Sequence, residues 1–220
     1  MMRPDRLDHL IWAAADLDQG IDHLEALSGV RAAVGGRHPG FGTRNALAGL
    51  GPGLYLEILA PDPGQDRTGT LGALVAGLAA PSLIGWSACG DDLDGLAARL
   101  PAAGLATPGR IAMTRTRPDG LRLDWSILGI GGHDFGALIP FLIDWQGSPH
   151  PADSAPAGLR LDRFSLKAPD PLAVASACAR LGIDLRPSQG KAGLYAEITG
   201  PKGPFTLATR GELPDRTFGR

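Results

Sequence analysis

Several features that commonly reveal a protein's function are scarce or missing in this sequence. It contains two cysteines, Cys89 and Cys178, both in apolar surroundings without a CxxC or zinc-like spacing. This argues against a disulfide framework or a cysteine-rich zinc site and favours two small buried side chains. Lysine and arginine (21) nearly balance aspartate and glutamate (23), so no charge excess favours nucleic acid or an anionic membrane. Motifs of serine hydrolases, P-loop NTPases and dinucleotide-binding enzymes are missing too.

Long hydrophobic runs are also missing. The longest run of small apolar residues covers positions 71–81, which is too short to span a bilayer. The first six residues are polar and are not followed by the apolar segment of a secretion signal. We therefore expect a cytoplasmic protein that binds no membrane and no nucleic acid, and whose partner is a small molecule.

Glycine and proline, in contrast, are abundant. The 32 glycines and 19 prolines follow no fixed period, which predicts many turns between short strands rather than a low-complexity chain. Hydrophobic residues make up 44% of the chain and charged residues 20%, as in ordinary globular proteins. A length of 220 residues is sufficient to bury a core without disulfide bonds.

The first part of the chain has a strand–helix–three-strand pattern. Strands are predicted at residues 7–14, 30–34, 44–50 and 54–59. A helix is predicted to begin at a capping motif that starts with Asp16 and to end at Gly29. A glycine-rich loop is predicted at residues 35–42. The first strand contains His9 and the last contains Glu57, so this βαβββ unit carries two potential metal ligands.

The same pattern begins again twice. Further strands are predicted at residues 82–88, 110–116, 121–128, 159–167, 194–198 and 205–208. A helix-capping aspartate recurs at Asp18, Asp94 and Asp170, each 76 positions from the next, which indicates an internal repeat. A hairpin turn is predicted at residues 118–120, and the apolar run at 138–145 is predicted to form a strand-like arm after that hairpin.

The predicted fold class is therefore α+β, with repeated βαβββ units that form a cupped mixed β-sheet with flanking helices. The expected segments are a first unit at 1–61, a linker helix at 62–81, a second unit at 82–145, a Pro-rich connector at 146–157 and a third, degenerate unit at 158–220. Either the first two units or the first and third are expected to pair. The remaining unit would leave sheet edges that a second copy could cover, so the sequence is compatible with a homodimer.

Several stretches, taken together and in order, resemble the glyoxalase-like domain family of the vicinal oxygen chelate superfamily, which includes glyoxalase, bleomycin-resistance and dihydroxybiphenyl dioxygenase proteins. These stretches are Leu7-Asp8-His9, residues 36–45, Tyr55-Leu56-Glu57, residues 117–120 and residues 139–145. The likeness covers residues 7 to about 145 and continues more weakly to 208. It implies that two units pair edge to edge around a cleft, where first and last strands of both units hold a divalent metal ion.

The resemblance assigns metal-ligand positions to His9 and Glu57. In the second unit, the 76-residue shift places a glycine where His9 stands, and aligning the closing strands places Asp124 where Glu57 stands. A catalytic divalent ion needs three or more nitrogen or oxygen ligands, and Asp124, His38 and His150 are the candidates for the third. The expected cofactor is a divalent metal ion such as Zn, Ni, Mn or Fe. Without the resemblance, a hydrogen-bonded core histidine and a solvent-facing glutamate would explain the same residues.

Other candidates come from the glycine-rich stretch and from aromatic residues. From composition alone, residues 35–45 form a hairpin turn with exposed charges, whereas the resemblance makes His38 and Asn45 catalytic candidates in the cleft. His38 would carry a proton near neutral pH. Strand alternation lets Asn45 or Arg44, but not both, face inward, and the apolar residues at 46–47 favour Asn45. The residues expected to line the substrate cleft are Arg37, Phe41, Trp125, Phe141 and Trp145, although aromatic residues at such spacing are commonly plain core.

Two functions follow from these candidates. The first is a metal-dependent lyase, isomerase or dioxygenase that acts on a small oxygen-rich substrate, with the metal stabilising an enolate or oxyanion. The alternative is a metal-free protein that binds and sequesters a small molecule in the same cleft, as the bleomycin-resistance relatives do. The intact pair of His9 and Glu57 favours the enzyme, and the missing second histidine favours the binding protein.

Overall fold

The computed structural model describes residues 6–116 and 120–215. The first five residues and positions 118 and 119 of the predicted hairpin turn lie outside this range. The first unit consists of β1 (Leu7–Ala13), α1 (Leu17–Ser28), β2 (Ala33–His38), β3 (Thr43–Gly51) and β4 (Leu54–Pro61). Its strands follow the order β2-β3-β4-β1, in which β1 and β4 run parallel. The predicted βαβββ unit is thereby confirmed.

The helix of each βαβββ unit begins at an aspartate cap, as predicted, but in the first two units the cap lies two residues before the predicted Asp18 and Asp94. Asp16 accepts a hydrogen bond from the Gln19 N–H and caps α1, while Asp92 caps α3 (Leu93–Arg99) and Asp170 caps α4 (Pro171–Arg180). The helix α1 ends at Gly29, whose φ of 82° is the left-handed conformation that glycine adopts readily. Local capping chemistry thus sets where these helices begin.

The second unit has the same topology, but its last strand is not the one that the sequence predicted. It contains β5 (Ser82–Cys89), β6 (Arg110–Thr116), β7 (Arg122–Leu128) and β8 (Phe141–Asp144), in the order β5-β8-β7-β6. The apolar run predicted as an arm is β8, which runs parallel to β5 as β4 runs parallel to β1. The predicted closing strand at 121–128 is β7, the third strand of the unit. This shift moves Asp124 away from the position that corresponds to Glu57.

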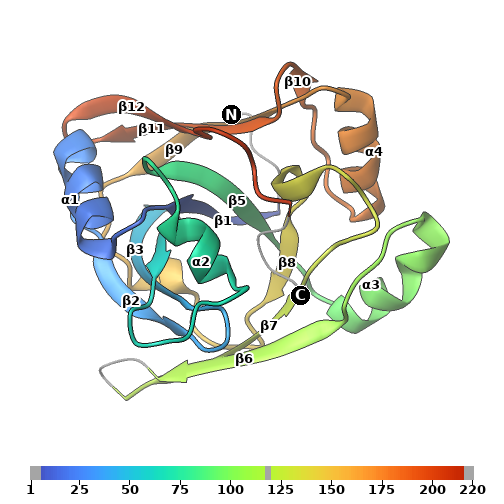
Figure 1. The fold of residues 1–220 in the computed structure, drawn as a ribbon, viewed down its shortest axis with the longest axis horizontal. Helices are drawn as coiled ribbons and strands as arrows, with labels where there is room; N and C mark the ends of the chain where they lie inside the picture. Colours follow the sequence, from blue (N-terminus) through green and yellow to red (C-terminus); the bar gives the residue numbers. More distant parts are fainter. Residues whose placement is uncertain (1–5, 117–119, 216–220) are drawn as a thin grey trace.

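The first two units pair through β1 and β5, which run antiparallel with Leu10 opposite Trp86. The result is one curved eight-stranded sheet (Figure 1). Its two edge strands, β2 and β6, approach each other across the concave side. The Arg115 side chain of β6 reaches β2, where a Cβ atom built on Gly36 would lie 2.8 Å from its Nη1. The sheet is therefore curled almost into a barrel, and the predicted α+β fold with a cupped mixed sheet is confirmed.

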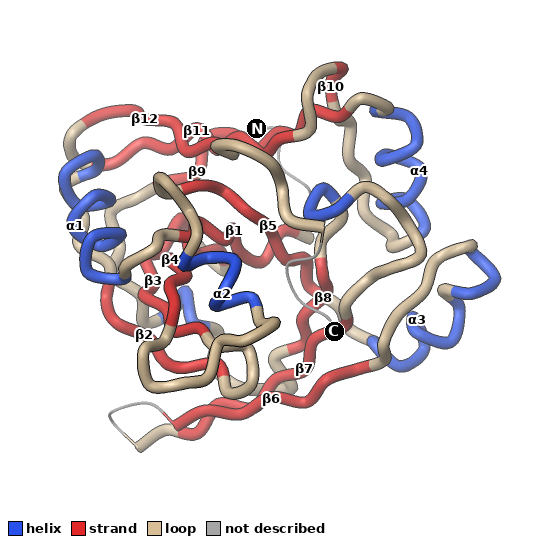
Figure 2. The backbone as a smooth tube through the Cα atoms, viewed as in Figure 1, coloured by secondary structure: helices blue, strands red, loops and turns tan. Residues whose placement is uncertain are grey.

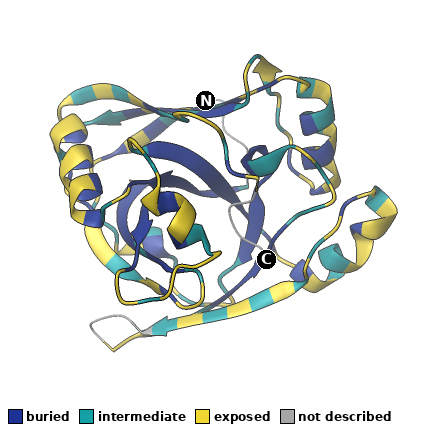
Figure 3. Ribbon diagram, in the orientation of Figure 1, coloured by how far each residue is buried: buried dark blue, intermediate teal, exposed yellow. Residues whose placement is uncertain are grey.

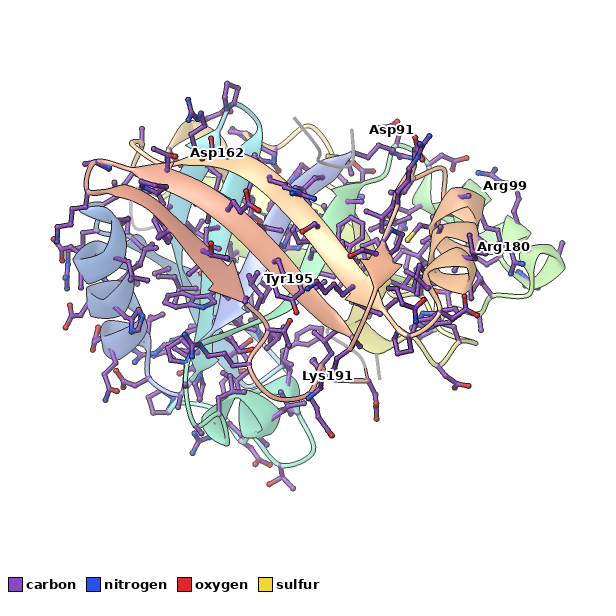
Figure 4. All side chains as sticks on the ribbon, turned by 90° about the horizontal axis from the view of Figure 1, so that it is seen from above. Asp91, Arg99, Asp162, Arg180, Lys191 and Tyr195 are labelled. Atoms are coloured by element: carbon purple, nitrogen blue, oxygen red, sulfur yellow. The ribbon has the colours of Figure 1, made fainter. Side chains whose placement is uncertain are left out.

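The third unit does not pair with the first. Its strands β9 (Arg160–Ala168), β10 (Ser188–Gln189), β11 (Gly193–Gly200) and β12 (Gly203–Ala208) form a separate four-stranded sheet in the order β10-β9-β11-β12. Phe164 of β9 contacts Trp86 of β5 at a ring distance of 5.4 Å, so this sheet covers the outer face of the large one. Its other face carries polar side chains such as Asp162 and Tyr195 (Figure 4).

Two apolar clusters lie on the two faces of the large sheet. The larger cluster packs the outer face against α1 and the small sheet, and most of the sheet is buried as a result (Figure 3). The smaller cluster fills part of the concave face, where α2 (Leu71–Ala76) lies beside β4 and buries Val75 (Figure 2). Among the described residues, no helix is long and apolar enough to cross a membrane. What remains of the concave face forms the candidate site.

Candidate functional site

A pocket opens on the concave face with about 470 Å³ of empty space, part of which is open to solvent. The residues that line it are His9, His38, Asn45, Leu47, Tyr55, Glu57, Met113, Arg115, Trp125, Ile127, Phe141, Ile143, Trp145 and Pro151. The first unit contributes nearly all of the acid–base groups. The second unit contributes apolar and aromatic side chains and one arginine. The pocket therefore has a polar wall and an apolar wall.

Glu57 lies at the centre of the polar wall and is only 4% exposed. Asn45, on the neighbouring strand β3, donates a hydrogen bond from Nδ2 to Oε1 of Glu57 at 2.6 Å. The backbone N–H of Gly36 donates to Oδ1 of Asn45 at 2.8 Å, and this contact fixes the orientation of the amide. The alternation of β3 and β4 thus places Asn45 in the pocket, as the sequence predicted.

His38 extends this network as a neutral imidazole. Its Nε2 lies 3.2 Å from Nδ2 of Asn45, which can only donate, so Nε2 accepts and the proton resides on Nδ1. Nδ1 lies 3.0 Å from the hydroxyl of Thr43, which can accept that proton. Burial lowers the pKa of His38, and the opposing effect of the Glu57 charge does not reverse the shift. His38 therefore holds Asn45 in place and remains uncharged near neutral pH.

His9 is oriented by the buried carboxylate of Asp8. A β-bulge between residues 7 and 9 interrupts the pairing of β1 with β5, and Nδ1 of His9 lies 2.6 Å from Oδ1 of Asp8. The His9 ring stacks on Tyr55 at a centroid distance of 4.6 Å. Its Nε2 faces Glu57, 3.9 Å from Oε2, which is too long for a hydrogen bond. A substrate atom can therefore approach both groups.

Asp8 is completely buried, and several donors converge on its second oxygen. Trp145 donates from Nε1 at 3.0 Å, Nε2 of His150 lies at 3.2 Å, and the thiol of Cys89 lies at 3.4 Å. Burial acts to raise the pKa of Asp8, but hydrogen bonds from His150 and His9 outweigh it and lower the pKa well below its usual value. Asp8 is therefore ionised at neutral pH and keeps the Nδ1 proton on His9.

The metal site expected from the sequence does not fit these residues. Among the described residues, no group of three or more His, Cys, Asp or Glu side chains is placed to hold a metal ion. The amide of Asn45 contacts both Nε2 of His38 and Oε1 of Glu57 through hydrogen bonds. As metal ligands, this leaves only His9 and the other carboxylate oxygen of Glu57. The facing positions on β8 are Phe141 and Ile143, which cannot act as ligands.

Two candidates for a third ligand lie in other surroundings. Asp124 stands between Leu123 and Trp125, which belong to the inner apolar cluster, so its side chain points to the opposite face of β7. There it forms an ion pair with Arg122, with Nη2 and Oδ1 2.9 Å apart. The prediction that Asp124 joins His9 and Glu57 is wrong for this reason. His150 contacts Asp8 rather than Glu57.

The predicted cleft residues divide into two groups. Trp125, Phe141 and Trp145 line the pocket, as expected. Arg37 does not, because its side chain is 68% exposed and lies 3.5 Å from Asp62. Phe41 lies in the turn between β2 and β3 and packs beside the inner cluster without lining the pocket. Residues 35–38 belong to strand β2 rather than to the predicted loop, which explains why His38 is buried while Arg37 is exposed.

Sequence reasoning missed three residues of the site: Asp8, Tyr55 and Arg115. No sequence signal points to Asp8, because regular alternation would place it on the opposite face from His9. Arg115 could have been found, since it continues the inward-facing positions of Ile111 and Met113 along β6 at a period of two.

Comparisons with known proteins agree with this architecture. A family model for the glyoxalase-like domain matches residues 7–182. No curated protein matches the chain significantly. A hypothetical protein from Staphylococcus aureus has 16% identity and a TM-score of 0.66, over 94% of this chain and 86% of that chain. A mutant 4-hydroxymandelate synthase from Streptomyces coelicolor has 18% identity and a TM-score of 0.50, over 94% and 63%. At these identities the likeness concerns the fold alone.

Proposed function

Because the chain belongs to the glyoxalase-like domain family, we propose that its pocket catalyses proton transfer on a small oxygen-rich substrate, as an isomerase or lyase does. The observation that carries this proposal is the buried pair of His9 and Glu57, whose facing atoms lie 3.9 Å apart at the pocket. Asp8 orients one member of the pair and Asn45 the other. Two acid–base groups held at such a distance can act on neighbouring atoms of one substrate.

The proposed reaction begins at a carbon next to a carbonyl group. Oε2 of Glu57 takes the proton from this carbon, the electron pair of the C–H bond forms a C=C bond to the carbonyl carbon, and the π electrons of the C=O bond move to the oxygen. Protonated His9 donates its Nε2 proton to that oxygen, which produces an enediol when the substrate carbon carries a hydroxyl group. His9 then removes the hydroxyl proton, and Glu57 returns its proton to the other carbon. Protons and charges balance over the cycle.

The surrounding residues make each step easier. The negative charge of Asp8 stabilises His9 while it is protonated, and it keeps Nε2 directed at the pocket. Asn45 holds Oε1 of Glu57, so Oε2 is the oxygen that meets the substrate. His38 has a positioning role through Asn45 in this scheme, instead of the proton-carrying role that the sequence suggested. Apolar side chains of the second unit line one side of the pocket, and such surroundings strengthen these charge interactions.

Hydrogen–deuterium exchange tests the proposal without knowledge of the natural substrate. The protein would be incubated in D₂O with hydroxyacetone, 2-hydroxyacetophenone or phenylpyruvate, and loss of the C–H signal next to the carbonyl would be followed by proton NMR. We expect exchange above the buffer rate, undiminished by dialysis against EDTA and lost in Glu57→Gln, in which Gln can still accept the Asn45 hydrogen bond. No exchange with any compound, or exchange that requires an added divalent metal ion, would contradict the proposal.

A second candidate function is supported by the apolar wall. Phe141 and Ile143 occupy the side of the pocket where the resemblance implied metal ligands, and such a surface suits a protein that binds a small molecule without transforming it. Saturable binding of 2-hydroxyacetophenone without exchange would favour this candidate. The cytoplasmic location and the homodimer expected from the sequence stay predictions.

A further inference from the structure

Arg115 lies where two hollows of the molecule meet. It lines the pocket described above, and it also lines an adjoining groove with about 740 Å³ of empty space, part of it open to solvent. Leu47 and Pro151 border both hollows as well. The groove is otherwise lined mainly by apolar or small residues: Ala33, Val34, Gly35, Leu123, Pro149, Ser154 and Ala155. Arg115 is the one charged residue among those that line this groove in the described part of the chain.

The opposite edge of the sheet leaves room for this guanidinium. A Cβ atom on Gly36 would lie 2.8 Å from Nη1 of Arg115 and 3.0 Å from its Cδ, and a Cβ on Gly35 would lie 3.2 Å from Nη1. Real Cβ atoms essentially never make contacts below 3.0 Å. Two consecutive glycines on β2 therefore permit Arg115 of β6 to reach the boundary between pocket and groove.

The position of Arg115 places its charge close to the acid–base groups. Its positive charge contributes to lowering the pKa of His38 and opposes the burial that raises the pKa of Tyr55, and both residues line the pocket. A group bound at Arg115 would therefore lie near His9 and Glu57. We propose that Arg115 binds the carboxylate of the substrate, which is a monocarboxylic acid with an apolar substituent that occupies the groove.

The negative charge of Glu57 favours a carboxylate over a phosphate. The planar N–H groups of Arg115 match the two oxygens of a carboxylate. A phosphate dianion would carry a second negative charge toward Glu57, and the groove supplies no further cation among its described lining residues. The apolar residues of the groove suit a hydrocarbon or aromatic substituent. This inference rests on the proposed function, because it assumes that the reacting carbon lies at His9 and Glu57.

Binding of two unreactive probes tests the inference separately from turnover. The full-length protein would be titrated with 3-phenylpropanoate and with 3-phenylpropanamide, its neutral counterpart of similar shape, by isothermal titration calorimetry. We expect the carboxylate to bind about tenfold more tightly or better. In Arg115→Gln, both probes should bind with affinities within about twofold of each other. The matched control is Arg37→Gln, which removes an exposed arginine of β2 outside the pocket and should preserve the preference.

A second variant keeps the charge but moves it. Gly36→Ala should push the guanidinium away and reduce the preference for the carboxylate probe without changing the affinity for the amide probe. The matched control is Gly77→Ala, where the nearest atom to an added Cβ lies 3.5 Å away; it should change the affinity for neither probe. Equal binding of the two probes by the wild type, an intact preference in Arg115→Gln, or no binding of either probe would overturn the inference. A carboxylate preference that is present in the wild type and lost in Arg115→Gln, together with unchanged exchange in Glu57→Gln, would instead contradict the proposed reaction alone.

Discussion

Replacing Asp8 by asparagine tests how the buried carboxylate supports both stability and chemistry. Asp8→Asn keeps the size of the side chain but removes the charge that accepts hydrogen bonds from His9 and Trp145. The lowered pKa of Asp8 shows that its environment stabilises the charged form on balance, and each pKa unit corresponds to about 1.4 kcal/mol. We therefore expect the free energy of unfolding to fall by about 2–4 kcal/mol.

The same substitution should also invert the tautomer of His9. If the asparagine oxygen keeps the donors on the Oδ2 side, its amide group faces Nδ1 of His9, which must then accept. The proton moves to Nε2, which can no longer accept a proton from a substrate. We expect the deuterium exchange rate to fall by about 10³-fold or more, as in enzymes whose histidine takes the wrong tautomer.

Urea unfolding and the NMR exchange assay would measure the two effects. The matched control is Asp124→Asn, which removes an exposed carboxylate on β7 and should leave the free energy of unfolding nearly unchanged. A melting temperature lowered on the order of 10 °C in Asp8→Asn alone would agree with the expected destabilisation. Equal stability of the two variants, or an exchange rate preserved in Asp8→Asn, would refute the reasoning.

Three further predictions concern pH, packing and thiol reactivity. Folding lowers the pKa of Asp8, so the stability that its ionised carboxylate contributes to the fold is present above its unfolded pKa of about 3.9 and is lost as the pH falls toward the folded pKa. The urea midpoints at pH 6 and pH 3 should therefore differ less in Asp8→Asn than in the wild type. Gly35→Ala would place a Cβ against Oδ1 of Asn45 and should destabilise the protein by about 1–3 kcal/mol in thermal unfolding, unlike Gly77→Ala. Burial raises the pKa of the Cys89 thiol to about 12, so iodoacetamide at pH 8 should modify it only after unfolding, as mass spectrometry would show; rapid labelling of the folded protein would contradict this.

Features that depend on neighbouring residues could be predicted from the sequence. The apolar strand around His9, the aspartate caps and the glycine stop at Gly29 are short-range patterns, because hydrogen bonds within a few residues produce them. Repetition of the pattern predicted the βαβββ units, but it left open whether the first unit pairs with the second or with the third. The resemblance implied that Asn45 and Glu57 lie in one cleft, and both side chains line the pocket because neighbouring antiparallel strands share their faces.

The rest depended on contacts between residues far apart in the chain. Whether 121–128 or 138–145 closes the second unit is decided by pairing with β5, which the sequence of neither segment reveals. The bulge that turns Asp8 toward His9 arises from pairing of β1 with β5. Arg115 meets Gly36 only because the sheet curls until its two edges approach. The sequence thus determined the units and most of the acid–base residues, whereas strand pairing and curvature, which sum many distant contacts, decided which side chains share the pocket.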